Sequence, residues 1–164
     1  MSERWLLSFL KHGQRYNYRT AGVIIRNGHV LVCREDTDDF VYLPGGRVEF
    51  GEPSNVALAR EIEEELHCTG KVGRLLFSVE NFFDLKEITF HEISKYYLVD
   101  LPGDFPYILD GPTLTTFDEG HELNFYWVPI SHKALTDINL LPKWLRGRLS
   151  NLPTQTEHLI EDER

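Results

Sequence analysis

Apolar residues recur at every second position, or in short unbroken runs, along much of the chain, which is the pattern of β-strands. Residues 18–27 form one such run, and residues 30–33 resume it directly after Asn27 and Gly28. Because Asn-Gly between two apolar runs is typical of tight turns, this segment predicts a β-hairpin. The same pattern predicts further strands over residues 40–43, 75–83, 88–99 and 123–128.

One segment changes to a helical period. Between Ser54 and His67 the apolar residues Leu58, Ile62 and Leu66 are spaced by four, so they lie on one face of a helix. The pattern therefore predicts an amphipathic helix over these residues, directly after a glycine-rich turn.

The hydrophobic pattern is less regular at the two ends of the chain and in one internal stretch. Residues 1–12 predict one or two amphipathic helical turns that pack Trp5, Phe9 and Leu10 onto the body. Ser131 is expected to cap a terminal helical region that runs to about residue 149, and the polar tail from about residue 153 is expected to fray. The Pro- and Gly-rich stretch 102–120 predicts a functional loop or an element that the pattern does not reveal.

Length, cysteine count and net charge disfavour several classes of protein. A length of 164 residues predicts one domain over residues 1–164. No apolar stretch reaches the ~20 residues that cross a bilayer. Two cysteines are too few for a disulfide framework, so a cytoplasmic location is expected. The net charge of −9 disfavours nucleic-acid binding but is compatible with small phosphorylated substrates, because a bound divalent cation reverses the local field.

Three glutamates of the predicted helix fall close together. With about 100° per residue, Glu61, Glu64 and Glu65 share one sector that borders the apolar face. Glu64 and Glu65 also occupy the last turns, where the helix dipole disfavours each negative charge by ~0.3–1 kcal/mol. A divalent cation such as Mg²⁺, held by oxygen ligands, would offset this cost. The helix therefore predicts a metal site rather than an ordinary solvated face.

The spacing around these glutamates follows a known motif. The residues at fixed spacing are Gly46, Glu52, Arg60, Glu61, Ile62, Glu64 and Glu65. This segment resembles the Nudix box, which places the same residue types at the same intervals. Two positions depart from the box, since His67 stands where the family usually has Gly and Cys68 where it prefers an aliphatic residue. The Gly normally helps the helix to end, so this departure concerns the end of the helix and not the ligands.

The resemblance implies an α/β (α+β) fold, the Nudix α/β/α sandwich around a mixed β-sheet. It also implies hydrolysis of a nucleoside diphosphate linked to another group, with Mg²⁺ as the cofactor and Mn²⁺ as a substitute. Glu61, Glu64 and Glu65 match the family's metal ligands, and the Gly45 carbonyl would complete the metal shell. Either Glu61 or Glu64 would deprotonate the attacking water, while Arg60 would orient the carboxylates.

Further site residues are expected outside the acidic part of the motif. Family members often supply another acidic ligand or base from a downstream loop, for which Glu119 is the first choice and Glu122 the second. Arg19 and Arg34, on the first two predicted strands, and Gly46 are the candidates for contacts with the phosphates. An ordinary turn acid and exposed strand arginines are the alternative interpretations of these side chains.

Two classes of function remain after the other motifs are excluded. The chain has no Walker loop, no Gly-x-Ser-x-Gly elbow and no second histidine that would complete a zincin helix. The first class is a hydrolase that acts on a small nucleotide, and the second is a non-catalytic nucleotide-sensing or partner-binding domain with the same fold. Neither class involves a membrane, and a homodimer is left open. The cleaved substrate also stays open among nucleotide sugars such as ADP-ribose, oxidised nucleoside triphosphates and dinucleoside polyphosphates.

Residues 80–83 and 91–92 carry the remaining candidates for recognition. On neighbouring predicted strands, their aromatic and polar side chains either form a base-stacking and polar wall or belong to the core.

Overall fold

The structure, a computed structural model, describes residues 3–164. Residues 1 and 2, part of the segment expected to form N-terminal helical turns, lie outside this range. The elements in chain order are β1 (Ser8–Lys11), β2 (Gln14–Val23), β3 (Ile25–Arg26), β4 (His29–Glu35), β5 (Gly45–Arg47), α1 (Ser54–Leu66), β6 (Lys71–Leu85), β7 (Ile88–Asp100), β8 (Leu114–Asp118), β9 (His121–Pro129), α2 (His132–Asp137), the 3₁₀ helix η1 (Lys143–Gly147) and β10 (Glu157–Asp162).

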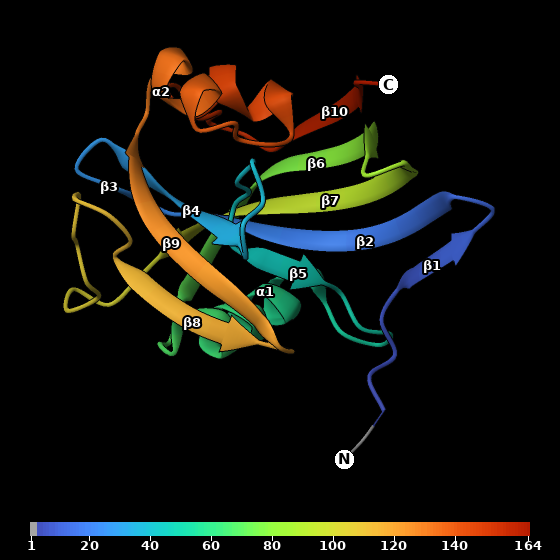
Figure 1. The fold of residues 1–164 in the computed structure, drawn as a ribbon, viewed down its shortest axis with the longest axis horizontal. Coiled ribbons are helices and arrows are strands. Elements are labelled where there is room, and N and C mark those ends of the chain that lie inside the picture. Colours follow the sequence, from blue (N-terminus) through green and yellow to red (C-terminus); the bar gives the residue numbers. More distant parts are fainter. Residues whose placement is uncertain (1–2) are drawn as a thin grey trace.

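The strands form two sheets (Figure 1). The larger sheet has the order β1-β2-β7-β6-β10. Its sixth strand, β5, also pairs with β2. Within it, β2 runs parallel to β7 and β10 runs parallel to β6, whereas the other pairs are antiparallel. The smaller sheet is antiparallel throughout, with the order β3-β4-β9-β8. The sheet arrangement is therefore mixed, as expected.

Helices cover the strands from two sides. The apolar face of α1, with Leu58 and Ile62, packs into a core cluster that includes Phe125 of the smaller sheet. Leu135 of α2 and Leu145 of η1 pack into a second cluster with buried residues of β2, β6 and β7. Figure 1 shows α1 and α2 on different sides of the larger sheet. These layers confirm the expected α+β sandwich.

The locally encoded elements form where the sequence predicts them. The Asn27-Gly28 hairpin joins β3 to β4, and φ values of 50° and 74° give both residues the left-handed conformation of a type I′ turn. The predicted amphipathic helix is α1, and three of the predicted strands lie within β6, β7 and β9. Residues 40–43 differ, since they pair through isolated bridges to Cys33 and Leu140.

The expected N-terminal helical turns are wrong. Residues 8–11 form the edge strand β1, which pairs antiparallel with β2. The tight turn at residues 12–13, with two positive φ values, favours this hairpin over a helix. Trp5, Phe9 and Leu10 are consequently exposed, and Trp5 stacks on the exposed ring of Phe50 instead of entering the core.

The second half of the C-terminal region differs from the structure that the sequence predicts. Ser131 caps α2 as predicted, because its hydroxyl accepts a hydrogen bond from Ala134 N at 3.1 Å. The helical region is divided into α2 and η1, and Pro142 precedes the second of these. The expected frayed tail is wrong, since β10 pairs along β6 and Leu159 packs against the core. The stretch 102–120 contains β8, the element that its pattern does not reveal.

Among residues 3–164, every helix is too short or too polar to cross a bilayer.

Candidate active site

Helix α1 carries the acidic residues and ends in an unusual way. Its last residue is Leu66, and His67 then adopts the left-handed conformation with φ 54° and ψ 36°. The His67 N–H donates to Glu63 O at 3.1 Å, which is the backbone bond of a left-handed cap. The helix thus ends where the motif requires, although His67 replaces the usual Gly.

Two glycines bring strand β5 against this helix. A Cβ atom on Gly45 would lie 2.1 Å from the Thr20 carbonyl oxygen, and one on Gly46 would lie 2.3 Å from the Glu61 carboxylate carbon. Neither position has room for a side chain. The backbone N–H of Gly45 lies close enough to the Glu65 carboxylate to act against the rise of its pKa. The Gly-Gly pair therefore places the backbone of β5 in direct contact with the two glutamates.

An acidic cluster lies at this contact. Glu61, Glu65 and Asp118 can each offer one carboxylate oxygen, and these oxygens lie within 4.8 Å of one another. Glu61 and Glu65 are 6% exposed, and within residues 3–164 Oε2 of Glu65 has no hydrogen-bond partner. Buried carboxylate oxygens without partners are costly unless a cation joins them. This set of oxygen ligands fits Mg²⁺ or Mn²⁺.

The two buried glutamates of the cluster have raised pKa values. Burial raises the pKa of Glu65 well above its ordinary value, and the negative charge of Glu61 raises it further. Burial also raises the pKa of Glu61, although Arg60 acts in the opposite direction. A divalent cation would favour the ionised form of both groups and reverse these shifts.

Arg60 connects the helix to the preceding loop. Its Nε and Nη2 donate to the two carboxylate oxygens of Glu52, both at 2.9 Å, and this contact lowers the pKa of Glu52. Nη1 of Arg60 donates to Glu61 at 2.9 Å and to Glu64 at 3.4 Å. Such charge-assisted bonds fix the position of each carboxylate. The orienting role that the Nudix resemblance implies for Arg60 stays a prediction, for which these bonds supply the contacts.

The remaining acidic candidates lie outside the cluster. Glu64 is 28% exposed and contacts Arg4 as well as Arg60. Glu119 is 73% exposed and lies 3.7 Å from Arg4, while the Glu122 side chain accepts a bond from Asn124 at 2.7 Å. The structure brings neither Glu119 nor Glu122 to the buried pair Glu61–Glu65.

Asp118 is the third acidic residue beside Glu61 and Glu65, and it was not predicted. It lies at the end of β8, opposite His121 of β9. The one available signal is the β-rich run Leu114-Thr115-Thr116-Phe117 before it, which marks a strand end close to the expected downstream acid.

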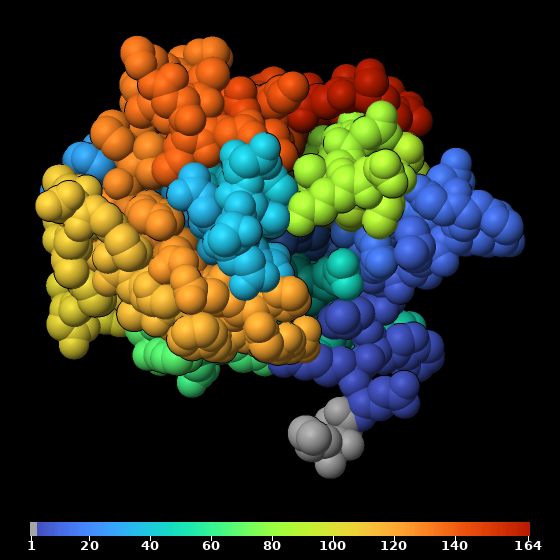
Figure 2. Space-filling view, in the orientation of Figure 1, coloured from blue at the N-terminus to red at the C-terminus, as the bar shows by residue number. Residues whose placement is uncertain are grey.

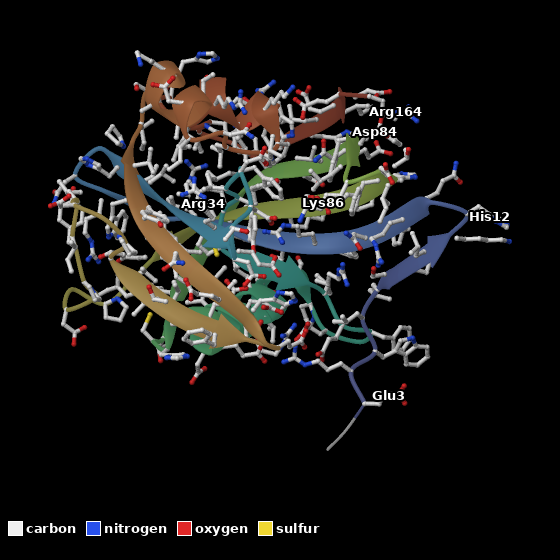
Figure 3. The ribbon with its side chains drawn as sticks, in the orientation of Figure 1. Glu3, His12, Arg34, Asp84, Lys86 and Arg164 are labelled. Carbon is white, nitrogen blue, oxygen red and sulfur yellow. The ribbon has the colours of Figure 1, made fainter. Side chains whose placement is uncertain are left out.

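A cavity of about 470 Å³ has Gly45 in its wall, whereas Glu61, Glu65 and Asp118 are not among its lining residues in the described part of the chain. Figure 2 shows the hollow between the loop over residues 35–42, the tip of the β6–β7 hairpin and β2. At the tip, Lys86 extends toward this loop and donates to Asp38 at 2.8 Å (Figure 3). The volume lies within the range of small-molecule sites, ~300–1,000 Å³.

The two predicted phosphate arginines have different positions. Arg19 lines the cavity, donates to Leu43 O at 2.8 Å and lies over the Tyr42 ring. Arg34 lies over the Tyr126 ring on the smaller sheet and is not among the residues that line the cavity within the described range. Arg47 lines the cavity next to Arg19, its partner in the β2–β5 register, and was not predicted.

Comparisons with known structures support the fold. A crystal structure of a UDP-X diphosphatase matches 87% of this chain and 66% of that chain, with a TM-score of 0.57 and 20% identity. An ADP-ribose pyrophosphatase from Streptococcus suis matches 88% of this chain and 98% of that chain, with a TM-score of 0.54 and 15% identity. A MutT NUDIX hydrolase from Burkholderia pseudomallei matches 75% of this chain and 95% of that chain, with a TM-score of 0.53 and 22% identity.

Sequence comparisons decide the family. No curated protein matches the chain. The family model described as the NUDIX domain matches residues 17–142, which include the Gly-Gly turn, all of α1 and Asp118. The chain therefore belongs to the Nudix family of hydrolases, as the motif that ends in α1 predicts.

Proposed function

We propose that this protein hydrolyses the pyrophosphate bond of a nucleoside diphosphate linked to another group, with Mg²⁺ or Mn²⁺ as the cofactor. The observation that carries the proposal is the cluster of the buried Glu61 and Glu65 with the half-buried Asp118, next to Gly45 in the wall of the cavity. When bound, the cation would stabilise charge on the phosphoryl oxygens and lower the pKa of water. The Gly45 carbonyl is a further candidate ligand, since its backbone adjoins Glu65.

The neighbouring residues have separate roles in this proposal. Glu64 retains access to solvent and is therefore suited to accept the proton of the attacking water. Arg60 is a positioning residue, because its bonds to Glu61 and Glu64 hold both carboxylates in place. Glu52 in turn holds Arg60 through two bonds.

The arginines beside the cluster are suited to the phosphates. Burial lowers the pKa of Arg47, and the positive charges of Arg15 and Arg19 lower it further. A phosphate placed between Arg19 and Arg47 would supply the missing negative charge and two charge-assisted hydrogen bonds. Arg34, on the other sheet, remains a candidate for a more distant part of the substrate.

The substrate panel follows from the structural neighbours. Two of them are named a UDP-X diphosphatase and an ADP-ribose pyrophosphatase. We therefore place UDP-sugars and ADP-ribose first, followed by nucleoside triphosphates, including oxidised ones, and dinucleoside polyphosphates.

The test compares two neighbouring glutamates of α1. Glu65→Gln removes one charge from the buried cluster, whereas Glu63→Gln changes an exposed residue of the same helix. With Mg²⁺, we expect kcat of Glu65→Gln to fall by about 10²–10⁴-fold on the substrate that the wild type cleaves. Glu63→Gln should retain wild-type activity.

The contradicting results are specific. Equal activity of Glu65→Gln and Glu63→Gln would remove the cluster from the reaction. Tight nucleotide binding in calorimetry without turnover of any substrate would favour the non-catalytic binding domain instead.

A further inference from the structure

One wall of the cavity is a polar row that crosses three strands of the larger sheet. The register places Asn17 of β2 opposite Glu92 of β7, and Glu92 opposite Asn81 of β6. All three residues line the cavity. Two positions along β6 and β7, Phe83 and Phe90 stack with ring centroids 4.8 Å apart and planes 5° apart. The wall thus presents aromatic surface beside hydrogen-bonding groups.

The members of this row differ in how their polar atoms are used. Glu92 accepts hydrogen bonds from Asn17 Nδ2 at 3.3 Å and from Ser94 Oγ at 2.8 Å. Asn17 Oδ1 accepts one from Ser8 at 2.6 Å. Asn81 is fully buried, and in the described part of the chain neither Oδ1 nor Nδ2 of its side chain has a partner. An unpaired buried carboxamide lowers the stability of a fold, so a ligand group that paired with Asn81 would supply hydrogen bonds that the described part of the chain does not.

The charged side chains that line the cavity indicate which part of a ligand would lie beside Asn81. Arg19 and Arg47 lie at the end next to Gly45 and the acidic cluster, where they attract phosphate. The carboxylate of Glu92 lies between this end and Asn81 in the register, and it disfavours an anion in the polar row. The group beside Asn81 is therefore the uncharged part of the substrate.

A carboxamide presents one donor and one acceptor side by side, and the edge of a nucleobase presents their complement. The apolar faces of Phe83 and Phe90 offer a surface for the same flat ring. We propose that Asn81 is a specificity-determining residue that pairs with the edge of the substrate's base. This inference rests on the proposed function, because it takes the ligand of the cavity to be a nucleotide.

The test measures binding and does not require hydrolysis. Calorimetry would give the Kd of the four common nucleoside 5′-monophosphates and of ribose 5-phosphate, which has the sugar and the phosphate but no base. We expect the wild type to bind at least one nucleotide about 10- to 100-fold more tightly than ribose 5-phosphate, the range that one two-bond contact to a base supplies. In Asn81→Leu, which keeps the side-chain volume but has no polar atom, this preference should fall to the part that contact of the base with Phe83 and Phe90 supplies, and the four nucleotides should bind with similar Kd.

Two controls keep the result interpretable. Glu80→Gln changes the adjacent residue of β6, which is absent from the cavity lining within residues 3–164, and should retain the preference. Asn81→Leu should unfold at the wild-type temperature or higher, because it removes an unpaired buried amide. If that variant did not fold, the Asn81 side-chain NH₂ resonance of the wild type would serve instead, since the preferred nucleotide should shift it and ribose 5-phosphate should not.

The outcomes separate this inference from the proposed function. An unchanged preference in Asn81→Leu, equal binding of ribose 5-phosphate and all four nucleotides by the wild type, or an unshifted Asn81 resonance would overturn the role of Asn81. Each of these results would leave Mg²⁺-dependent hydrolysis and its loss in Glu65→Gln intact. Base-dependent binding without hydrolysis would overturn the proposed reaction alone.

Discussion

His67 holds a conformation that L residues adopt at a cost. Its φ of 54° lies in the left-handed region, where a Cβ atom meets the following carbonyl oxygen. We expect His67→Gly to raise the free energy of unfolding by about 0.5–1 kcal/mol in urea titrations, with an unchanged m-value. His67→Ala retains the Cβ atom and should give no such gain. A loss of stability in His67→Gly would show that the imidazole makes contacts that offset the strain.

Some residues of the candidate site are placed by spacing along one helix, and others are placed by tertiary packing. Glu61 and Glu65 could be predicted because fixed spacing on one helix determines which carboxylates share a face, whereas Glu64 contacts Arg4 and Arg60 outside the cluster. Arg60 could be predicted for the same reason. Asp118 could not be predicted, because it reaches Glu65 through the packing of β8 against α1 and not through any local pattern.

At the scale of elements, strand β10 forms in the tail that the sequence pattern predicts to be frayed. Leu159 of β10 packs against the core, whereas its neighbour Ile160 is 66% exposed. We expect Leu159→Ala to lower the free energy of unfolding by about 1–2 kcal/mol, less than the ~2–5 kcal/mol of a fully buried leucine. Ile160→Ala should change it by less than about 0.5 kcal/mol. Equal effects of the two substitutions in denaturant titrations would mean that β10 is not docked on β6 in solution.

The elements that could be predicted are those whose signal is local. Helix α1 has three turns of apolar spacing, and β6 and β7 are long enough for their alternation to be visible. In contrast, β1 and β8 are short strands, and β10 is largely polar. These three form because a longer strand offers unpaired backbone groups along its edge, which is information that lies elsewhere in the chain.

For the whole molecule, the acidic cluster couples metal binding to stability. At a concentration 100 times its Kd, Mg²⁺ should stabilise the fold by about 2.7 kcal/mol, or roughly 5–10 °C in thermal unfolding. Chelation should reverse this gain, and Glu65→Gln should reduce it strongly. An equal Mg²⁺ effect in the wild type and in Glu65→Gln would place the ion elsewhere.

The same coupling has a defined dependence on pH. Burial raises the pKa of Glu65 in the folded state above its ordinary value of 4.5. The protonated group therefore favours the fold at low pH, and this contribution is lost as the pH rises from about 4.5 through the raised value. Because protons and Mg²⁺ compete for the carboxylate, the stabilisation by Mg²⁺ should be larger at pH 8 than at pH 5 in matched thermal scans.

The pairing of β10 with β6 also bears on the order in which the chain folds. Phe77 meets Glu157 and Phe82 meets Asp162, so the outer edge of β6 is closed by residues that leave the ribosome long after it. Until then, β6 exposes a row of free N–H and C=O groups to other nascent chains. Premature termination before Glu157 would make this exposure permanent, and its product would associate edge to edge instead of accumulating as a monomer.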